Sequence, residues 1–196
     1  MYLYDIMQDI LAKLLEWDKT LFLYINGQWT NSLLDTVMPW LRNANNWIPL
    51  YVIILSYLFY NWGKMAWKWV VLVALNVALT DQISSHIFKP FFQRLRPCAD
   101  PNMFQKVRLL LDHCSGGFSF TSSHAANHFG VAFFIVITLS PLFKNYRYFF
   151  LIWAALIAYA QVYVGVHYPL DILVGSIIGC VVGYFNGLLF HKWQSK

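Results

Sequence analysis

Long apolar stretches separated by short polar segments make up most of this chain of 196 residues. Each has the length of a membrane-spanning helix, for which about 17 to 25 mainly apolar residues suffice. Tryptophans lie at or near the ends of several stretches, where indole rings favour the lipid headgroup layer. The pattern predicts an all-α fold, a polytopic transmembrane helix bundle with spans at 47–63, 66–88, 124–143, 148–166 and 169–190.

The first 45 residues follow a different pattern. Residues 1–17 interleave acidic and basic side chains with Leu, Ile and Met, which is typical of an amphipathic helix on a membrane surface. Residues 19–45 contain the turn signal Asn26-Gly27 and scattered charges, so we expect them to continue along the interface. The alternative is a tilted sixth span near 19–40.

The whole chain, 1–196, is therefore predicted to be one membrane domain. It joins an interfacial segment at 1–45 to a transmembrane bundle at 46–196, with five to six membrane helices and a candidate active-site loop at 89–123. Composition supports this, since 59% of the residues are hydrophobic and 12% are charged, whereas soluble domains carry about 25% charged residues.

The order of the spans predicts which polar segments share a membrane face. The ends of 66–88 and 148–166 and the starts of 124–143 and 169–190 lie on one side. Positive residues in short loops favour the cytoplasm, so we assign the opposite side to the inside and this shared side to the outside. The opposite side holds basic residues and no acidic ones: Lys64, Lys68, Lys144, Arg147, Lys192 and Lys196.

The small and sulfur-containing residues carry three further expectations. Cys98 and Cys114 both fall in the outer loop, where an oxidising compartment permits a disulfide, and two free thiols are the alternative. Cys180 lies in a span and is expected to pack inertly. A glycine recurs every four residues in the last span, which favours close helix packing inside the bundle over a dimer contact: Gly175, Gly179, Gly183 and Gly187.

Three polar clusters on the predicted outer face carry the candidate chemistry. In the first, Lys89 and Arg96-Pro97 follow the second span. The second is Phe118-Ser119-Phe120-Thr121-Ser122-Ser123-His124-Ala125, where a hydroxyl cap and unpaired first-turn amides would form a seat for phosphate. In the third, His167 and Asp171 stand four residues apart across a proline, so the carboxylate can orient the imidazole. Read singly, these clusters are also explained as lipid anchors, a helix cap and a structural hydrogen bond.

Together these clusters supply what phosphoryl transfer requires. They contain two cations, a group of unpaired backbone amides and two histidines, one of which has a carboxylate partner. At these residues the chain resembles the type 2 phosphatidic acid phosphatases, which include bacterial integral-membrane lipid phosphatases. The resemblance implies that His167 attacks phosphorus and becomes a phosphohistidine, that Asp171 orients it, and that His124 protonates the leaving alcohol. It also implies that no metal or cofactor is needed and assigns the phosphate oxygens to Lys89, Arg96 and Ser122.

Two departures from the family pattern affect the phosphate pocket. The family's Pro-Ser-Gly-His is Thr-Ser-Ser-His here, so Ser123 replaces a glycine, and we expect it to contribute to phosphate binding. The family's third motif has an arginine where this chain has Gln161, which donates hydrogen bonds without charge. We expect Gln161 in the pocket, with Arg94 or His128 as a spatial substitute for the arginine.

The sequence thus predicts a lipid phosphatase of a bacterial inner membrane that acts at the outer face on a lipid phosphate or diphosphate monoester. Its partners would be that substrate and the bilayer, with no nucleic acid. Resemblance suggests phosphatidic acid, phosphatidylglycerol phosphate, undecaprenyl diphosphate or a lipid A phosphate as substrate. The alternatives are a lipid phosphotransferase on the same scaffold and a non-catalytic lipid-phosphate binding or transport protein.

Overall fold

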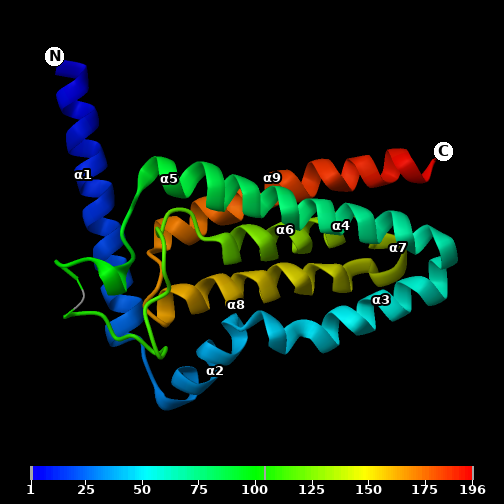
Figure 1. Ribbon diagram of the computed structural model, residues 1–196, viewed down its shortest axis with the longest axis horizontal. Helices are drawn as coiled ribbons and strands as arrows, with labels where there is room; N and C mark the ends of the chain where they lie inside the picture. Colours follow the sequence, from blue (N-terminus) through cyan, green and yellow to red (C-terminus); the bar gives the residue numbers. More distant parts are fainter. Residues whose placement is uncertain (1, 104, 196) are drawn as a thin grey trace.

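The computed structural model describes residues 2–103 and 105–195, and Figure 1 shows that a bundle of long helices dominates them. Successive rods of the bundle run in opposite directions along its long axis (Figure 1). The all-α bundle predicted from the hydrophobic pattern is therefore confirmed. Its rods are α3 (Ile48–Trp62), α4 (Ala66–Asp81), α6 (Ser123–Thr138), α8 (Phe149–Tyr163) and α9 (Pro169–Gln194).

The helices α3, α4, α6 and α8 are shorter than the apolar stretches that predicted them, whereas α9 continues past the predicted end at residue 190. Turns of 3-10 helix at Gly63–Met65 and Lys144–Tyr148 end the rods, and π-helical Gln82–Phe88 joins α4 to α5 (Lys89–Phe92). By length and composition alone, the helical stretches Ala44–Ala99 and Pro169–Gln194 are able to cross a membrane.

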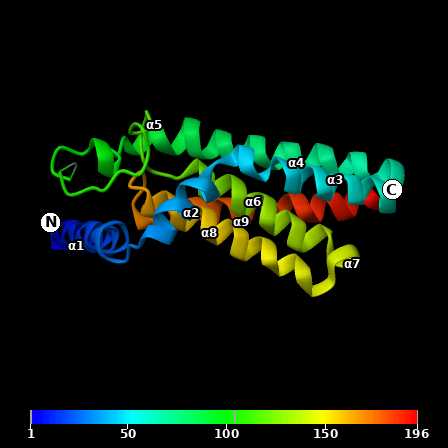
Figure 2. The same cartoon turned by 90° about the horizontal axis from the view of Figure 1, so that it is seen from below.

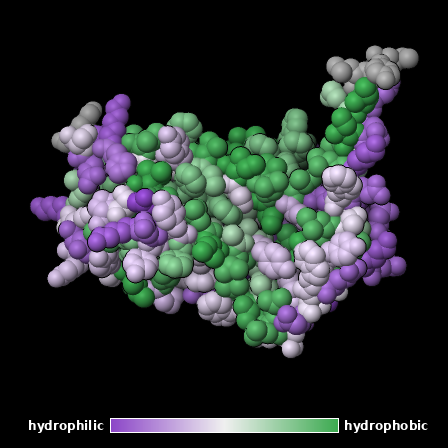
Figure 3. Space-filling model, turned by 180° about the vertical axis from the view of Figure 1, so that it is seen from behind, coloured by the Kyte–Doolittle hydropathy of each residue, from purple (hydrophilic) through white to green (hydrophobic). Residues whose placement is uncertain are grey.

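The count of such spans becomes three if the pair Ser123–Thr138 and Ser140–Tyr163, bent by 74°, is taken as one span; Ser140–Phe143 is the short helix α7. Ala44–Ala99 itself contains α3 and α4, which run antiparallel (Figure 1). Seen from behind, hydrophilic residues gather at the two ends of the molecule and a hydrophobic band lies between them (Figure 3).

The N-terminal segment lies across one end of the bundle. Helix α1 (Tyr2–Leu23) runs roughly perpendicular to the rods, as Figures 1 and 2 show from two directions. A π-helical turn, Tyr24–Gln28, then leads to α2 (Ser32–Arg42) beside α8. The Asn31 side chain accepts a hydrogen bond from Leu34 N at 2.9 Å and so begins a new helix. The alternative of one tilted span near 19–40 is therefore wrong.

Asn26 of the Asn26-Gly27 turn signal is buried and forms hydrogen bonds to two distant parts of the chain. Asn26 Nδ2 donates to the carbonyl oxygens of Arg108 and Tyr163, both at 2.8 Å, and Asn26 Oδ1 accepts from Arg108 N at 2.8 Å. Arg108 Nη1 in turn donates to both Asp35 carboxylate oxygens at 2.7 Å. These contacts hold the N-terminal segment against the loop at 89–123 and α8, and they explain one of the basic residues of that loop.

The glycine stripe of α9 packs against α6. A Cβ added at Gly179 would lie 2.3 Å from Ala126 O, and one at Gly183 would lie 2.5 Å from Gly130 O. Only glycine permits this approach, which agrees with packing inside the bundle. The close contact brings the first turns of the two helices together, so that Ser122 N donates to Asp171 O at 3.0 Å.

Candidate active site

The three polar clusters meet at one end of the bundle. Here α5 follows α4, α6 begins, and α8 connects to α9 (Figure 1). We call this the site end. Helix α1 crosses the same end, and the C-terminus of α9 lies at the opposite one (Figure 1).

A tight turn between α8 and α9 presents His167. Gly165 adopts φ +93°, a conformation that favours glycine, and an added Cβ would lie 3.0 Å from Arg108 O. The backbone N–H groups of Val166 and His167 both donate to Gln161 O at 3.2 Å. The turn therefore fixes the backbone of His167, whose side chain is buried.

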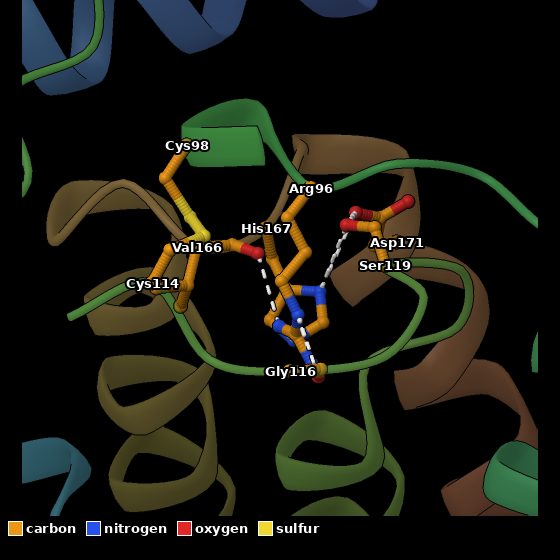
Figure 4. Close-up of a disulfide and its surroundings, with 8 residues drawn as sticks. All are labelled: Arg96, Cys98, Cys114, Gly116, Ser119, Val166, His167 and Asp171. Carbon is orange, nitrogen blue, oxygen red and sulfur yellow. Dashed lines mark hydrogen bonds and ion pairs between the residues drawn. A yellow bond between two sulfur atoms is a disulfide. The ribbon is translucent and has the colours of Figure 1, made fainter. Parts of the chain in front are cut away.

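Asp171 and Ser119 surround one nitrogen of the imidazole. Asp171 Oδ2 lies 3.4 Å from His167 Nδ1 and accepts a hydrogen bond of 2.8 Å from Tyr168 N. Ser119 Oγ donates to the same carboxylate oxygen and lies 3.3 Å from His167 Nδ1 (Figure 4). Ser119 belongs to the second cluster of the sequence, but sequence reasoning gave it no role of its own beside His167 and Asp171.

Arg96 contacts the other imidazole nitrogen. Its Nη1 lies 3.0 Å from His167 Nε2 and donates to Val166 O at 3.1 Å, while Nε and Nη2 donate to Gly116 O, each at 3.3 Å (Figure 4). Because a guanidinium only donates, Nε2 must be the acceptor. The ring proton then lies on Nδ1, facing Asp171. This tautomer leaves the Nε2 lone pair on the cationic side of the ring.

A disulfide joins the two segments that hold Arg96. Cys98 and Cys114 are bonded, with their Cα atoms 5.8 Å apart. Arg96 lies two residues before the first cysteine and Gly116 two residues after the second (Figure 4). The bond thus links the residue that carries the guanidinium to the carbonyl that accepts from it.

Burial lowers the pKa of His167 to about 4. The nearby cations Arg96 and Lys89 lower it further, whereas the hydrogen bond and charge of Asp171 raise it. The imidazole is therefore neutral at neutral pH, as a nucleophile must be.

Arg94 supports the aspartate rather than replacing the family arginine. Its Nη1 lies 2.8 Å from Asp171 Oδ1 and its Nη2 lies 2.5 Å from Asp18 Oδ2, so both ends of the fork bind carboxylates. The guanidinium carbon also lies 3.9 Å from the centre of the Tyr168 ring. Asp18 is a contact that the sequence did not indicate.

His128 is also used in packing. Its Nδ1 lies 2.8 Å from the carbonyl oxygen of His124, and its ring centre lies 5.0 Å from that of Trp153. The residue is 7% exposed. It therefore braces the first turns of α6 and is not directed at the phosphate seat.

The start of α6 carries the second cluster. Ser122 caps the helix through a 3.4 Å hydrogen bond from Ala125 N. The Ser123 hydroxyl instead bonds to Ser84 Oγ and Ser85 Oγ, both at 3.0 Å, so this side chain is committed to the π-helical segment Gln82–Phe88. His124 is half-buried and lies within electrostatic range of His167 and three further groups of the site: Arg42, His128 and Lys89.

Gln161 lies in α8, and its backbone carbonyl accepts the hydrogen bonds of the turn that carries His167. Its side chain is fully buried, and Oε1 accepts a hydrogen bond of 3.3 Å from Arg42 Nε. Arg42 ends α2, within the segment predicted to be interfacial, and no motif in the sequence indicated it.

Among residues 2–103 and 105–195, no group of three His, Cys, Asp or Glu side chains is arranged to hold a metal ion.

Comparisons with known proteins agree with this geometry. Residues 66–195 match the family model of the PAP2 superfamily. The chain is 34% identical over 175 residues to a lipid A 4'-phosphatase of Porphyromonas gingivalis, an alignment that covers 88% of this chain and 72% of that protein. It is 33% identical over 181 residues to a lipid A 4'-phosphatase of Bacteroides thetaiotaomicron, with coverage of 91% and 79%.

A solved structure shares the fold. The first transmembrane PAP2 type phosphatidylglycerolphosphate phosphatase from Bacillus subtilis aligns with a TM-score of 0.68 at 22% identity. The alignment covers 92% of this chain and 87% of that chain. Together with the family match, it confirms the resemblance that the three motifs suggested.

Proposed function

This chain belongs to the PAP2 superfamily and is a membrane lipid phosphatase, and we propose that it removes a phosphate group from lipid A through a phosphohistidine on His167. The Arg96–His167–Asp171 alignment carries the chemical part of the proposal. One side of the ring faces a carboxylate, and the other side offers a lone pair next to a cation.

In the first step, His167 Nε2 attacks phosphorus and the bond between phosphorus and the lipid oxygen breaks. For this, the Arg96 N–H that contacts Nε2 turns to a phosphate oxygen. His124 gives a proton to the departing lipid alcohol, and Asp171 stabilises the positive charge that develops on the imidazole.

In the second step, water attacks the phosphohistidine and returns its proton to His124. The N–P bond breaks, which releases inorganic phosphate and restores neutral His167. Lys89, Arg96 and the first amides of α6, from Ser122 and Ser123 onward, neutralise the phosphate oxygens in both steps. These cations do the work that a metal ion would otherwise do, so the reaction needs no cofactor.

Two observations support a site on the outer face of a bacterial inner membrane. A disulfide at the site end suits an oxidising compartment. The turns at the opposite end carry lysine and arginine residues and no aspartate or glutamate in the sequence, a composition that suits the cytoplasm. A C-terminal fluorescent-protein fusion should therefore fluoresce, whereas a C-terminal alkaline phosphatase fusion should be inactive; the reverse result would contradict the orientation.

The substrate assignment rests on the two relatives named lipid A 4'-phosphatase. We propose a phosphate monoester on lipid A as the preferred substrate. The test measures phosphate release by the purified protein from lipid A, phosphatidylglycerol phosphate, phosphatidic acid and undecaprenyl diphosphate. Lipid A should give the highest kcat/KM, and activity should survive chelators.

The His167→Gln variant is the blank, and enzyme supplied with ³²P-labelled substrate and quenched in alkaline detergent should carry base-stable, acid-labile label only when His167 is present. Release of phosphate by His167→Gln at the wild-type rate would contradict the mechanism. A preference for another lipid would contradict the substrate assignment alone.

A further inference from the structure

The side chain of Arg42 points from α2 toward the proposed phosphate pocket without a carboxylate to neutralise it. Its Nε donates to Gln161 Oε1, a neutral acceptor. Within residues 2–103 and 105–195, Arg42 forms no salt bridge, and no hydrogen bond involves its Nη1 or Nη2. The two nitrogens at the end of the fork thus keep their donors for another ligand.

The amide beside it has an unmet donor. Gln161 is fully buried, and its Nε2 finds no hydrogen-bond partner within the same part of the chain. Leaving a buried amide donor unpaired is unfavourable, because the group has lost its hydrogen bonds to water. Because Arg42 occupies Oε1, the orientation of the amide is settled, and Nε2 is the group available to an anion.

Arg42 lies among the other positive groups of the site. It is within electrostatic range of Arg96 and of His124, and Lys89 couples to both of these residues. Asp171 offsets part of the charge of Arg96 and Lys89, and Asp81 offsets part of that of Lys89. The remaining like charges repel one another, so the cluster is stabilised when an anion binds between them. A phosphate carries the charge and the acceptor oxygens that such a cluster lacks.

Helix α2 holds Arg42 at this position. Two turns before it, Asp35 accepts a hydrogen bond of 2.6 Å from the Tyr163 hydroxyl of α8. Just after Arg42, Trp47 Nε1 donates to Leu41 O at 2.8 Å, and the Trp47 ring packs edge-on against Trp153 of α8, with ring centres 5.5 Å apart. The end of α2 that carries Arg42 is therefore anchored on both sides of this residue.

We infer that Arg42 and Gln161 together bind an oxygen of the substrate phosphate, with Arg42 supplying the charge that Gln161 lacks. The inference rests on the proposed function, because it places the phosphate between Arg96 and His124. It makes the N-terminal segment a direct part of the phosphate pocket, supplied by a helix outside the three motifs.

The test exchanges the two side chains. Arg42→Gln should lower kcat/KM by about 100-fold, in the range found when one donor to a developing charge is lost. It should also weaken competitive inhibition by inorganic phosphate by about tenfold or more. Adding Gln161→Arg to Arg42→Gln should restore at least tenfold of the lost kcat/KM, since a guanidinium then enters the pocket from α8.

Controls separate binding from folding. Arg147→Gln, at the opposite end of the bundle, should retain wild-type kcat/KM and phosphate inhibition. Arg42→Lys should fall between wild type and Arg42→Gln, because a lysine keeps the charge and loses the fork. If Arg42→Gln alone melts at a lower temperature, Arg42→Lys and the exchanged double variant decide the question.

Orthophosphate binding, measured by calorimetry on the purified protein, distinguishes this inference from the proposed function. A folded Arg42→Gln variant with wild-type kcat/KM and wild-type phosphate affinity would overturn the role of Arg42 and leave the lipid phosphatase intact. Absence of phosphate release from every lipid, with orthophosphate affinity that still depends on Arg42, would reject the proposed substrate chemistry and retain the anion site.

Discussion

Asp18 of α1 and Asp171 of α9 share one guanidinium. Arg94 Nη1 lies 2.8 Å from Asp171 Oδ1, and Arg94 Nη2 lies 2.5 Å from Asp18 Oδ2. Asp18 Oδ1 also accepts a hydrogen bond of 2.7 Å from Leu170 N, at the start of α9. The helix that crosses the site end therefore holds the carboxylate that orients His167.

Asp18→Asn should lower kcat by about tenfold with little change in KM. The amide keeps the shape of the side chain but loses the charge that fixes Arg94, so Asp171 is held less firmly against His167. Asp9→Asn, on the exposed part of the same helix, is the matched control and should leave kcat unchanged. Equal kcat in Asp18→Asn and wild type would show that Asp171 needs no support from α1.

Ser119→Ala should lower kcat by about tenfold and leave KM nearly unchanged. The hydroxyl donates to Asp171 Oδ2 and lies next to His167 Nδ1, so its loss lets the carboxylate shift relative to the ring. Steady-state kinetics on a lipid substrate provide the measurement. Ser176→Ala, which removes a hydroxyl that bonds to Ile172 O in α9, controls for the loss of any buried hydroxyl. A rise in KM alone would mean that Ser119 contacts substrate instead.

The depressed pKa of His167 predicts how stability changes with pH. In the unfolded chain this imidazole takes up a proton near pH 6.5, whereas in the folded protein its pKa is lowered to about 4. The unfolded state therefore binds more protons between these values, so stability is full above pH 6.5 and declines as the pH falls toward 4.

The measurement compares thermal unfolding of wild type and His167→Gln in detergent from pH 4 to pH 8. Wild type should lose about 3 kcal/mol relative to the variant over this window, since one pKa unit is worth about 1.4 kcal/mol. Other titrating groups cancel in the difference. A difference independent of pH would show that His167 titrates normally in the folded protein.

Reduction of the disulfide should weaken both stability and catalysis. Cys98 and Cys114 close a loop with a sequence separation of 16, which is worth about 3 kcal/mol of unfolding free energy. The same loop holds Arg96 against Gly116, so Cys98→Ser with Cys114→Ser should also lower kcat/KM. Cys180→Ser tests the free thiol and should change neither quantity; an unchanged melting temperature in the double variant would contradict the predicted stabilisation.

Much of the fold follows from local pattern. Hydrophobic length predicted the helical bundle, and the order of the spans predicted that His124 and His167 would lie at one end. The helix ends were less well predicted: α4 ends at Asp81, and the rest of the predicted span 66–88 is the π-helical segment Gln82–Phe88, whose Ile and Phe side chains continue the apolar pattern. The break before α2 depends on the Asn31 cap, a signal that the sequence analysis passed over in favour of Asn26-Gly27.

The candidate site likewise contains some residue pairs that local spacing predicts and others that it does not. His167 and Asp171 are four residues apart, and Lys89 and Arg96 are seven apart, so their spacing is visible in the chain itself. Ser119 lies 52 residues from Asp171, and Arg42 lies 119 residues from Gln161. No local pattern relates such pairs, because each belongs to an element with its own periodicity.

The sequence by itself determined that the chain forms a bundle of long apolar helices and that the histidines, the aspartate and the cations of the candidate site lie at one end of it. Both properties depend on side chains close together in the chain and on the length of apolar segments. Only the tertiary structure decided which cations remain available to phosphate and which neutralise carboxylates. That choice depends on how α1, α2 and the outer loop pack across the end of the bundle, since two chemically equal guanidinium groups differ only in which charged groups the fold brings beside them.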